Sequence, residues 1–317
     1  MVVDFTWIVQ NNYEVNKMKY AIIDLGSNTV RLSVYTVVEN QEFRLLFSEK
    51  ETAGLANYVE EKALSREGME KAGFVINTFL NLLRQLSIEN IYIFATASLR
   101  NIVNAEQAAQ YLKENTGVDV DIVLGKDEAE YSFAGALNTV DIDTGVMFDI
   151  GGGSTEIVAF TNRKPLTAQS FNCGCLNLAN RYIRKIFPTK EELKQIKEKI
   201  RKTFAGLTYQ ERTERLCGVG GTIRAILQIV NVYFEKDKDN TVITAEEFKK
   251  IKKVLLRKDE TAKKLILRTS PDRIHTIISG ICIVDALVKR FDAKEIFVSR
   301  YGVREGYLCR KILANMT

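Results

Sequence analysis

The stretch "FDIGGGSTEI", residues 148 to 157, places three consecutive glycines between an apolar run and a Ser-Thr-Glu step. Glycine weakens a strand interior, so three in succession indicate a tight turn or a close approach of the backbone to a ligand. An earlier stretch, "IDLGSNTV" at 23 to 30, repeats this theme. In both, an apolar strand delivers an aspartate and then turns through glycine and small polar residues.

The two stretches stay in step at an offset of 149 − 24 = 125 residues, with Asp24 falling on Asp149. Two copies of one unusual motif indicate a duplicated half-domain. Strands alternate with helices around both copies, which is typical of an α/β fold. At 317 residues, the chain is long enough for two domains of ordinary size.

Capping residues and apolar periodicity place the elements of the first half. Ser65 is predicted to cap a helix that continues to Leu86. Asn104 is predicted to cap the next helix, with Gln107 at the capping-box position. A further helix is expected over 126–137. Strands are expected over 91–96 and 118–124, and the chain beyond 185 is expected to be mainly helical apart from 214–222 and 295–302.

Each glycine hairpin can direct backbone N–H groups and small polar side chains into one concavity, which suits phosphate oxygens. The aspartate at the strand end can hold a divalent metal, usually through water for magnesium. One Asp-x-Gly is usually an ordinary hairpin turn, whereas two in register favour a ligand site. A third loop, "GVGGT" at 218–222, leads into a helix whose N-terminus offers further amide donors to an anion. No G-x-x-x-x-G-K-[ST] stretch occurs, which excludes a Walker-type nucleotide site.

Phosphate chemistry also needs a cation and a group that orients the nucleophile. Arg100 follows a predicted strand, where α/β folds place ligand residues, and is either that cation or half of a surface ion pair. Glu128 lies at a predicted helix start, where the helix dipole keeps a carboxylate ionised. It either accepts a proton from water or caps the helix, and Asp127 is its local competitor.

Composition excludes several classes of protein. His275 is the only histidine, which argues against serine–histidine triads and three-histidine zinc sites, and we expect it to be a packed or hydrogen-bonded structural residue. No two of the five cysteines have the C-x-x-C spacing of a zinc or redox site, and their odd number argues against a secreted disulfide framework. The best apolar run, at 277–288, contains Asp285 and is too short to span a bilayer. We therefore expect a cytoplasmic protein with neither a membrane nor a nucleic acid as partner.

The net charge of +5, from 45 Lys and Arg against 40 Asp and Glu, is mild. The stretch "KEELKQIKEKIRK" at 190–202 is typical of a solvated helix face, with a surface for a polyanion as the alternative. Residues 1–17 show no periodic element. They are expected to be a tail, or to precede a start at Met18.

Six stretches occur in the order found in the Ppx/GppA phosphatases: "AIIDLGSNTVRL", "ATASLRN", "GKDEAEYSFAGA", "FDIGGGSTEI", "GVGGTIRAI" and "FVSRYGVREG". The chain thus resembles the exopolyphosphatases and guanosine pentaphosphate phosphohydrolases, in the two-domain branch of the actin, heat-shock ATPase and sugar-kinase superfamily. The resemblance implies an α/β fold of two ribonuclease-H-like domains with a cleft between them. It places domain I at 18–125 and domain II, with a helical insertion, at 126–301. The segment 302–317 is expected to pack back on domain I.

By resemblance, Glu128 is the general base that activates water for in-line attack on a terminal phosphorus, with Asp149 and Arg100 as further catalytic residues. Magnesium or manganese is the implied cofactor, and Asp24, Asp149 and Glu156 are its implied ligands. The implied phosphate-binding positions are Ser27, Asn28, Gly151, Gly152, Gly153, Ser154, Gly220, Gly221 and Thr222.

The resemblance implies an exopolyphosphatase that removes terminal phosphate from inorganic polyphosphate. The alternatives are a 5′-phosphohydrolase of guanosine pentaphosphate (pppGpp), a phosphotransferase of the same superfamily, and a non-catalytic sensor of polyphosphate or alarmones. The family resemblance also makes ppGpp a candidate inhibitor and a homodimer a candidate assembly. The chain departs from the family pattern at Asp127, usually Glu, and at His275 and Ser279, commonly Asp and Pro.

Overall fold

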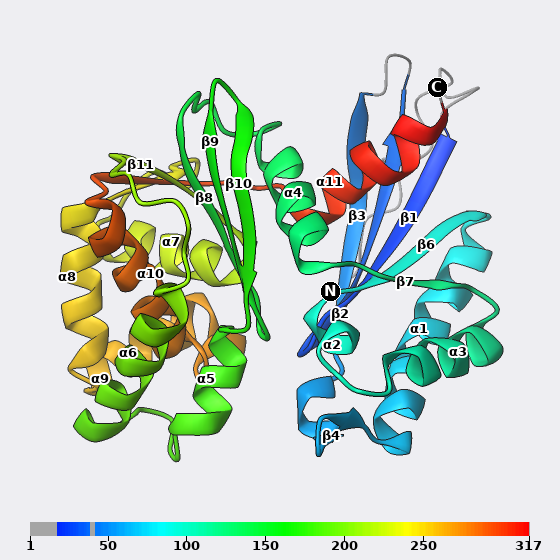
Figure 1. The fold of residues 1–317 in the computed structure, drawn as a ribbon, viewed down its shortest axis with the longest axis horizontal. Coiled ribbons are helices and arrows are strands. Elements are labelled where there is room, and N and C mark those ends of the chain that lie inside the picture. Colours follow the sequence, from blue (N-terminus) through cyan, green and yellow to red (C-terminus); the bar gives the residue numbers. More distant parts are fainter. Residues whose placement is uncertain (1–17, 39–41, 317) are drawn as a thin grey trace.

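The computed structural model describes residues 18–38 and 42–316, so the expectation for residues 1–17 lies outside the described residues. The described chain forms two lobes, each built around its own β-sheet (Figure 1). None of the described helices is long and apolar enough to cross a membrane.

The first sheet has the strand order β3-β2-β1-β6-β7. Its first three strands form an antiparallel meander, and β6 and β7 continue from β1 in parallel. Its elements are β1 Met18–Leu25, β2 Thr29–Val37, β3 Phe43–Thr52, the 3-10 turn η3 Leu55–Tyr58, β4 Val59–Glu60, β5 Ala63–Leu64, α1 Arg66–Gln85, β6 Asn90–Ala95, α2 Ala97–Arg100, α3 Ala105–Thr116 and β7 Val120–Ile122.

The second sheet has the order β10-β9-β8-β11-β13-β12. Its first five strands repeat the order and directions of the first sheet, and β12 adds an antiparallel edge strand. The repeat confirms the predicted α/β fold with a duplicated domain. The elements are α4 Gly125–Ala136, β8 Gly145–Ile150, β9 Thr155–Thr161, β10 Lys164–Phe171, α5 Cys175–Tyr182, α6 Lys190–Phe204, β11 Arg215–Val219, α7 Gly220–Tyr233, β12 Val242–Thr244, α8 Ala245–Leu256, α9 Glu260–Thr269, the 3-10 turn η4 Pro271–Arg273, α10 Ile277–Phe291 and β13 Glu295–Val298.

The side chains of β1 pack into two different hydrophobic cores, because successive side chains of a strand point to opposite faces. Ile23 and Leu25 join the core that α1 and α3 cover. Tyr20 and Ile22 join a second core beneath the end of the chain. Asp24 has the parity of Tyr20 and Ile22, so it lies on the face that the C-terminal segment covers.

The corresponding strand of the second sheet, β8, divides its side chains in the same way. Phe148 and Ile150 belong to the large core shared with the helices of this lobe. Met147 belongs to the core beneath α4, and Ser132 of α4 donates a hydrogen bond to Asp149 Oδ2 at 2.8 Å. Asp149 therefore lies on the face that α4 covers.

The C-terminal segment comprises α11 Val303–Tyr307, the π-helical turn η5 Leu308–Ile312 and the 3-10 turn η6 Leu313–Met316. It lies on the first sheet, where Leu308 and Ile312 are buried, and α11 runs beside α4 between the lobes (Figure 1). The contact requires glycine, because a Cβ on Gly135 would lie 2.0 Å from the Gly302 carbonyl oxygen.

Local signals locate most elements, and Ser65 caps α1 as predicted, accepting from the Gly68 N–H at 3.2 Å. Asn104 precedes α3 but does not cap it, because its amide bonds the backbone of Leu64 at 2.9 and 3.0 Å. The prediction of a packed His275 is wrong, since this residue is exposed in a turn. The strand β10 has no counterpart among the predicted elements.

Candidate active site

A cavity of about 410 Å³ lies between the two sheets. Both glycine hairpins line it, together with the third glycine loop and the start of α11. Arg100 and Thr222 are not among its lining residues. The predicted site residues that do line it are Asp24, Ser27, Asn28, Glu128, Asp149, Gly151, Gly152, Gly153, Ser154, Glu156, Gly220 and Gly221.

The two hairpins close with the same hydrogen bond. The Gly26 N–H donates to the Thr29 carbonyl at 3.1 Å, and the Gly151 N–H donates to the Ser154 carbonyl at 3.0 Å. These pairs are related by the same offset of 125 residues found in the sequence. The duplication therefore extends to the backbone of the site.

The N-terminus of α5 orients the peptides of the second hairpin. The carbonyls of Gly151, Gly152 and Gly153 accept N–H groups of residues 174–177 at 3.0–3.1 Å. In a trans peptide the next N–H points opposite to the carbonyl. The N–H groups of residues 152–154 therefore point away from α5, toward the cavity that these residues line, where they suit an anion.

The first hairpin is supported in the same way at the start of η3. The carbonyls of Ser27 and Asn28 accept the N–H groups of Ala56 and Gly54 at 2.9 and 2.8 Å. The two hairpins also meet, because a Cβ on Gly153 would lie 2.9 Å from Ser27 Oγ. Glycine at this position thus allows the two halves of the site to approach each other.

The third loop requires glycine for two reasons. Gly220 has φ +88°, a conformation that other residues rarely adopt, and a Cβ there would lie 2.3 Å from Asp149 Oδ1. Thr222 has a structural position instead of a phosphate-facing one. It is buried, and its hydroxyl donates to the Ile150 carbonyl at 3.0 Å, which joins the start of α7 to the end of β8.

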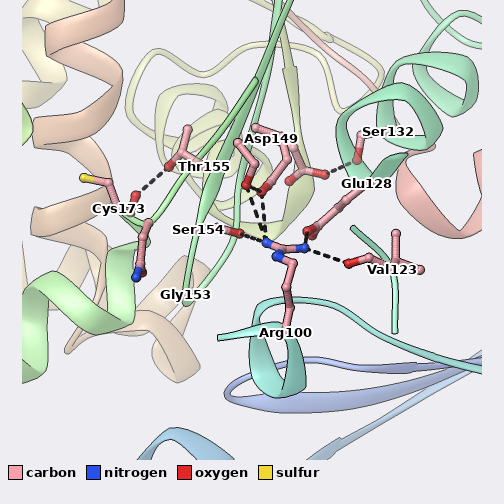
Figure 2. A network of polar contacts seen from close by, with 12 residues as sticks. Arg100, Val123, Glu128, Ser132, Asp149, Gly153, Ser154, Thr155 and Cys173 are labelled. Atoms are coloured by element: carbon pink, nitrogen blue, oxygen red, sulfur yellow. Dashed lines mark hydrogen bonds and ion pairs between the residues drawn. The ribbon is translucent and has the colours of Figure 1, made fainter. Parts of the chain in front are cut away.

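Arg100 lies behind the cavity wall and bonds the groups that form it. Figure 2 shows its guanidinium between Glu128 and Ser154. Nη1 donates to Glu128 Oε2 at 2.6 Å, and Nη2 donates to Ser154 Oγ at 3.4 Å and lies 3.8 Å from Glu156 Oε1. Arg100 is thus neither a surface ion pair nor a cavity-lining cation. It holds the acidic side chains in place.

Glu128 does not cap the helix on which it lies. Leu124 occupies the cap position of α4, and the Glu128 carboxylate bonds Arg100 and lines the cavity. Burial raises the pKa of Glu128 well above its usual value, and the nearby charge of Glu156 adds to this, while Arg100 opposes it. A carboxylate with a raised pKa is a stronger general base once it is ionised. Asp127, its competitor, does not line the cavity.

Glu156 is the most enclosed acid of the site, with 1% exposure. The Ser170 hydroxyl donates to its Oε1 at 2.7 Å. Burial raises the pKa of Glu156 to about 7, and the charge of Asp149 acts in the same direction. Burial and neighbouring negative charge thus raise the pKa of Glu156 as they raise that of Glu128.

The cavity is lined by four arginines that the sequence reasoning did not select: Arg31, Arg224, Arg273 and Arg304. Arg304 Nη1 donates to Ser33 Oγ at 2.7 Å, and Arg224 Nη1 donates to the Arg300 carbonyl at 3.1 Å. Burial lowers the pKa of Arg224 to about 10, and the charge of Arg304 acts in the same direction. Such a concentration of cations fits a ligand with several negative charges.

Asp24 and Asp149 are the acids best placed to hold a cation, because both line the cavity from equivalent strand ends. Burial raises the pKa of Asp24 to about 6, although Arg304 and Arg31 act in the opposite direction. Magnesium is commonly held by one or two carboxylates and completed by substrate phosphates and water. Two half-buried carboxylates at equivalent strand ends fit that ion.

Glu156 does not complete a three-carboxylate set with Asp24 and Asp149. Within residues 18–38 and 42–316, no group of three or more His, Cys, Asp or Glu side chains is arranged to hold a metal by itself. Glu156 is bonded to Ser170. Any magnesium in this cavity would therefore depend on phosphate oxygens for further ligands.

The sequence and the fold both have counterparts among known proteins. The chain is 25% identical to a Haemophilus influenzae protein that carries the name of an exopolyphosphatase, over 95% of this chain and 94% of that one. It is 24% identical to a guanosine-5′-triphosphate,3′-diphosphate pyrophosphatase of Photobacterium profundum, over 90% of this chain but only 58% of that longer one.

Two crystal structures share the fold. An exopolyphosphatase from Cytophaga hutchinsonii superposes with a TM-score of 0.83 at 21% identity, covering 94% of this chain and 98% of that one. A Ppx/GppA family member from Aquifex aeolicus gives a TM-score of 0.78 at 23% identity, covering 95% and 100%. The family model described as Ppx/GppA phosphatase matches residues 33–315. The chain therefore belongs to the Ppx/GppA phosphatase family.

Proposed function

We propose that this phosphatase removes the terminal phosphate of inorganic polyphosphate by in-line attack of water. The composition of the cavity wall carries the proposal. Arginines, carboxylates, backbone amides and small hydroxyl side chains line the cavity, whereas no aromatic side chain among the described residues does so. A guanine base would normally be stacked on an aromatic ring or held by several side-chain hydrogen bonds. A substrate made only of phosphate groups needs neither.

Glu128 is the proposed general base. Its carboxylate lines the cavity and is positioned by Arg100, so it can accept a proton from water that attacks the terminal phosphorus. The amides of residues 152–154 and the four arginines would bind the phosphate oxygens on which charge is concentrated. Arg100 is a positioning residue in this scheme, since it touches Glu128, Glu156 and Ser154 and does not line the cavity.

Asp24 and Asp149 are the residues that would hold magnesium or manganese. When bound, a divalent ion would neutralise phosphate charge and help to orient the chain. Ser132 fixes Asp149 for this role through its 2.8 Å hydrogen bond. Gly220 leaves the space that this carboxylate occupies.

Hydrolysis of pppGpp is the close alternative, since one relative carries the name of such an enzyme. The deciding experiment measures phosphate released from long-chain polyphosphate and from pppGpp, each with and without magnesium. We expect a higher kcat/KM on polyphosphate and dependence on the ion. A higher kcat/KM on pppGpp would overturn the substrate assignment, and binding without release would favour a sensor. Transfer to a nucleotide or sugar would favour a phosphotransferase.

We also propose a cytoplasmic location, which the five free cysteines support because disulfides are rare in that compartment. Inhibition by ppGpp and assembly as a homodimer stay predictions from the family resemblance. Phosphate release in the presence of ppGpp tests the first, and sedimentation of the purified chain tests the second.

A further inference from the structure

A row of charged residues crosses the first sheet outward from the cavity. Asp24 on β1 is paired in register with Arg31 on β2, and Arg31 is paired with Lys50 on β3. Residues directly opposite each other on neighbouring strands project from the same face of the sheet. Asp24 and Arg31 line the cavity, as does Thr52, two residues beyond Lys50 on the same face.

Lys50 therefore lies at the outer end of this row, beyond Asp24 and Arg31, and is not itself among the residues that line the cavity. Neighbouring strands are about 4.8 Å apart, so the backbone of Lys50 is roughly 10 Å from that of Asp24. Its side chain is 37% exposed, whereas the inner members of the row are more enclosed. A phosphate chain whose end reaches Asp24 and that leaves along this row would pass Arg31 and then Lys50.

The partner of Lys50 comes from the other lobe. Lys50 Nζ lies 2.7 Å from Asp272 Oδ2, and Asp272 belongs to η4 and lines the cavity together with Arg273. The Asp272 side chain is 50% exposed, so water screens this ion pair and it contributes little to stability. An incoming polyanion can replace this carboxylate at small cost.

We propose that Lys50 binds a phosphate of the chain that follows the terminal one, and that Asp272 occupies this lysine until the chain displaces it. The proposal rests on polyphosphate as the substrate, and it makes Lys50 a determinant of affinity for long chains. If the Lys50–Asp272 ion pair only held the two lobes together, loss of either residue would break it in the same way. Both substitutions would then change the Kd in the same direction.

The direction in which each of two substitutions changes the Kd separates these two models. We would measure the Kd of long linear polyphosphate in a Glu128→Gln background, which prevents turnover. Lys50→Met should raise the Kd roughly two- to fivefold, and Asp272→Asn should lower it by a similar factor. Asp272→Asn should have a smaller effect when Lys50 is already methionine, because it would act through that lysine.

A matched pair on the first lobe controls for the change of charge. Lys113 and Asp119 also lie 2.7 Å apart on the surface, and neither lines the cavity. Lys113→Met and Asp119→Asn should leave the Kd unchanged. A shift of Kd in the same direction for Lys50→Met and Asp272→Asn, or no shift for either, would overturn the subsite.

The experiments distinguish failure of the proposed hydrolysis from failure of the Lys50 subsite. Phosphate release by the unmodified protein tests hydrolysis, whereas the Kd values test the Lys50 subsite without turnover. Binding of polyphosphate with the expected opposite shifts but without phosphate release would reject the enzyme and keep the subsite. Absence of any polyphosphate binding would reject the subsite itself.

Discussion

Arg31 and Glu156 occupy the same position in the two copies of the hairpin, 125 residues apart, and carry opposite charges. Arg31 lies opposite Asp24 across β1 and β2, and Glu156 lies opposite Asp149 across β8 and β9. The first copy thus pairs an acid with a base, whereas the second places two acids side by side. The two copies of the hairpin therefore carry different charges at equivalent positions of a single cavity.

Glu156 should set the pH at which Glu128 becomes ionised. Its charge raises the pKa of Glu128, so Glu156→Gln should move the acidic limb of the kcat/KM profile to lower pH. The measurement is kcat/KM for polyphosphate from pH 5 to 9. Glu130→Gln removes an exposed charge from the same helix and should leave the limb in place. If the acidic limb of Glu156→Gln lies at the same pH as that of the unmodified protein, the limb does not report the ionisation of Glu128.

Gly220 should be needed for the position of Asp149 as well as for its own backbone conformation. Gly220→Ala places a Cβ 2.3 Å from Asp149 Oδ1, and we expect kcat/KM to fall by about 100-fold or more because the carboxylate proposed to hold the metal is displaced. The assay is phosphate release at saturating magnesium.

Gly117→Ala is the matched control for Gly220→Ala. Gly117 also has a positive φ, +76°, but a Cβ there meets nothing within 4 Å. It should lose about 1–2 kcal/mol of unfolding free energy and keep its activity. Equal activities of the two alanine variants would show that backbone strain, and not the Asp149 contact, explains the glycine.

Ionised Asp24 should lower the free energy of unfolding at neutral and alkaline pH. Burial raises its pKa from 3.8 to about 6, so the folded state favours the protonated form. Its stabilising contribution is complete below pH 3.8 and is lost as the pH rises through about 6. Asp24→Asn should therefore become more stable than the unmodified protein between pH 4 and 8, by up to about 3 kcal/mol.

Thermal unfolding of Asp24→Asn and the unmodified protein across this pH range would check the expectation, and activity should be lost in the same variant. Asp119→Asn, which removes a largely exposed carboxylate, should show no such divergence. A stability difference that is independent of pH would contradict a raised pKa of Asp24 in the folded state.

Features encoded within a few residues could be predicted from the sequence. The two hairpins were predictable because Asp, Gly and small polar residues determine both the turn and the direction of its amides. Ser65 caps α1 because its partner is three residues away. The α/β fold followed from the alternation of such local units.

Features that depend on distant partners could not be predicted. Asn104 has a cap residue's sequence, yet its amide bonds Leu64, 40 residues earlier. Arg304 reaches the cavity because the chain returns from the second lobe to Ser33, 271 residues away in sequence. Glu128 could be a cap or a base until Arg100, 28 residues earlier, was placed beside it. Arg31 is the exception, since its position opposite Asp24 follows from the hairpin register.

The most direct test of the account is the turnover of polyphosphate by Glu128→Gln, with the Kd measured on the same preparation. We predict that kcat falls by about 10²- to 10⁴-fold because the base is lost, while the Kd stays within about twofold. Asp127→Asn, which changes the neighbouring acid outside the cavity, should keep its activity. Turnover by Glu128→Gln at the rate of the unmodified protein would contradict the central claim.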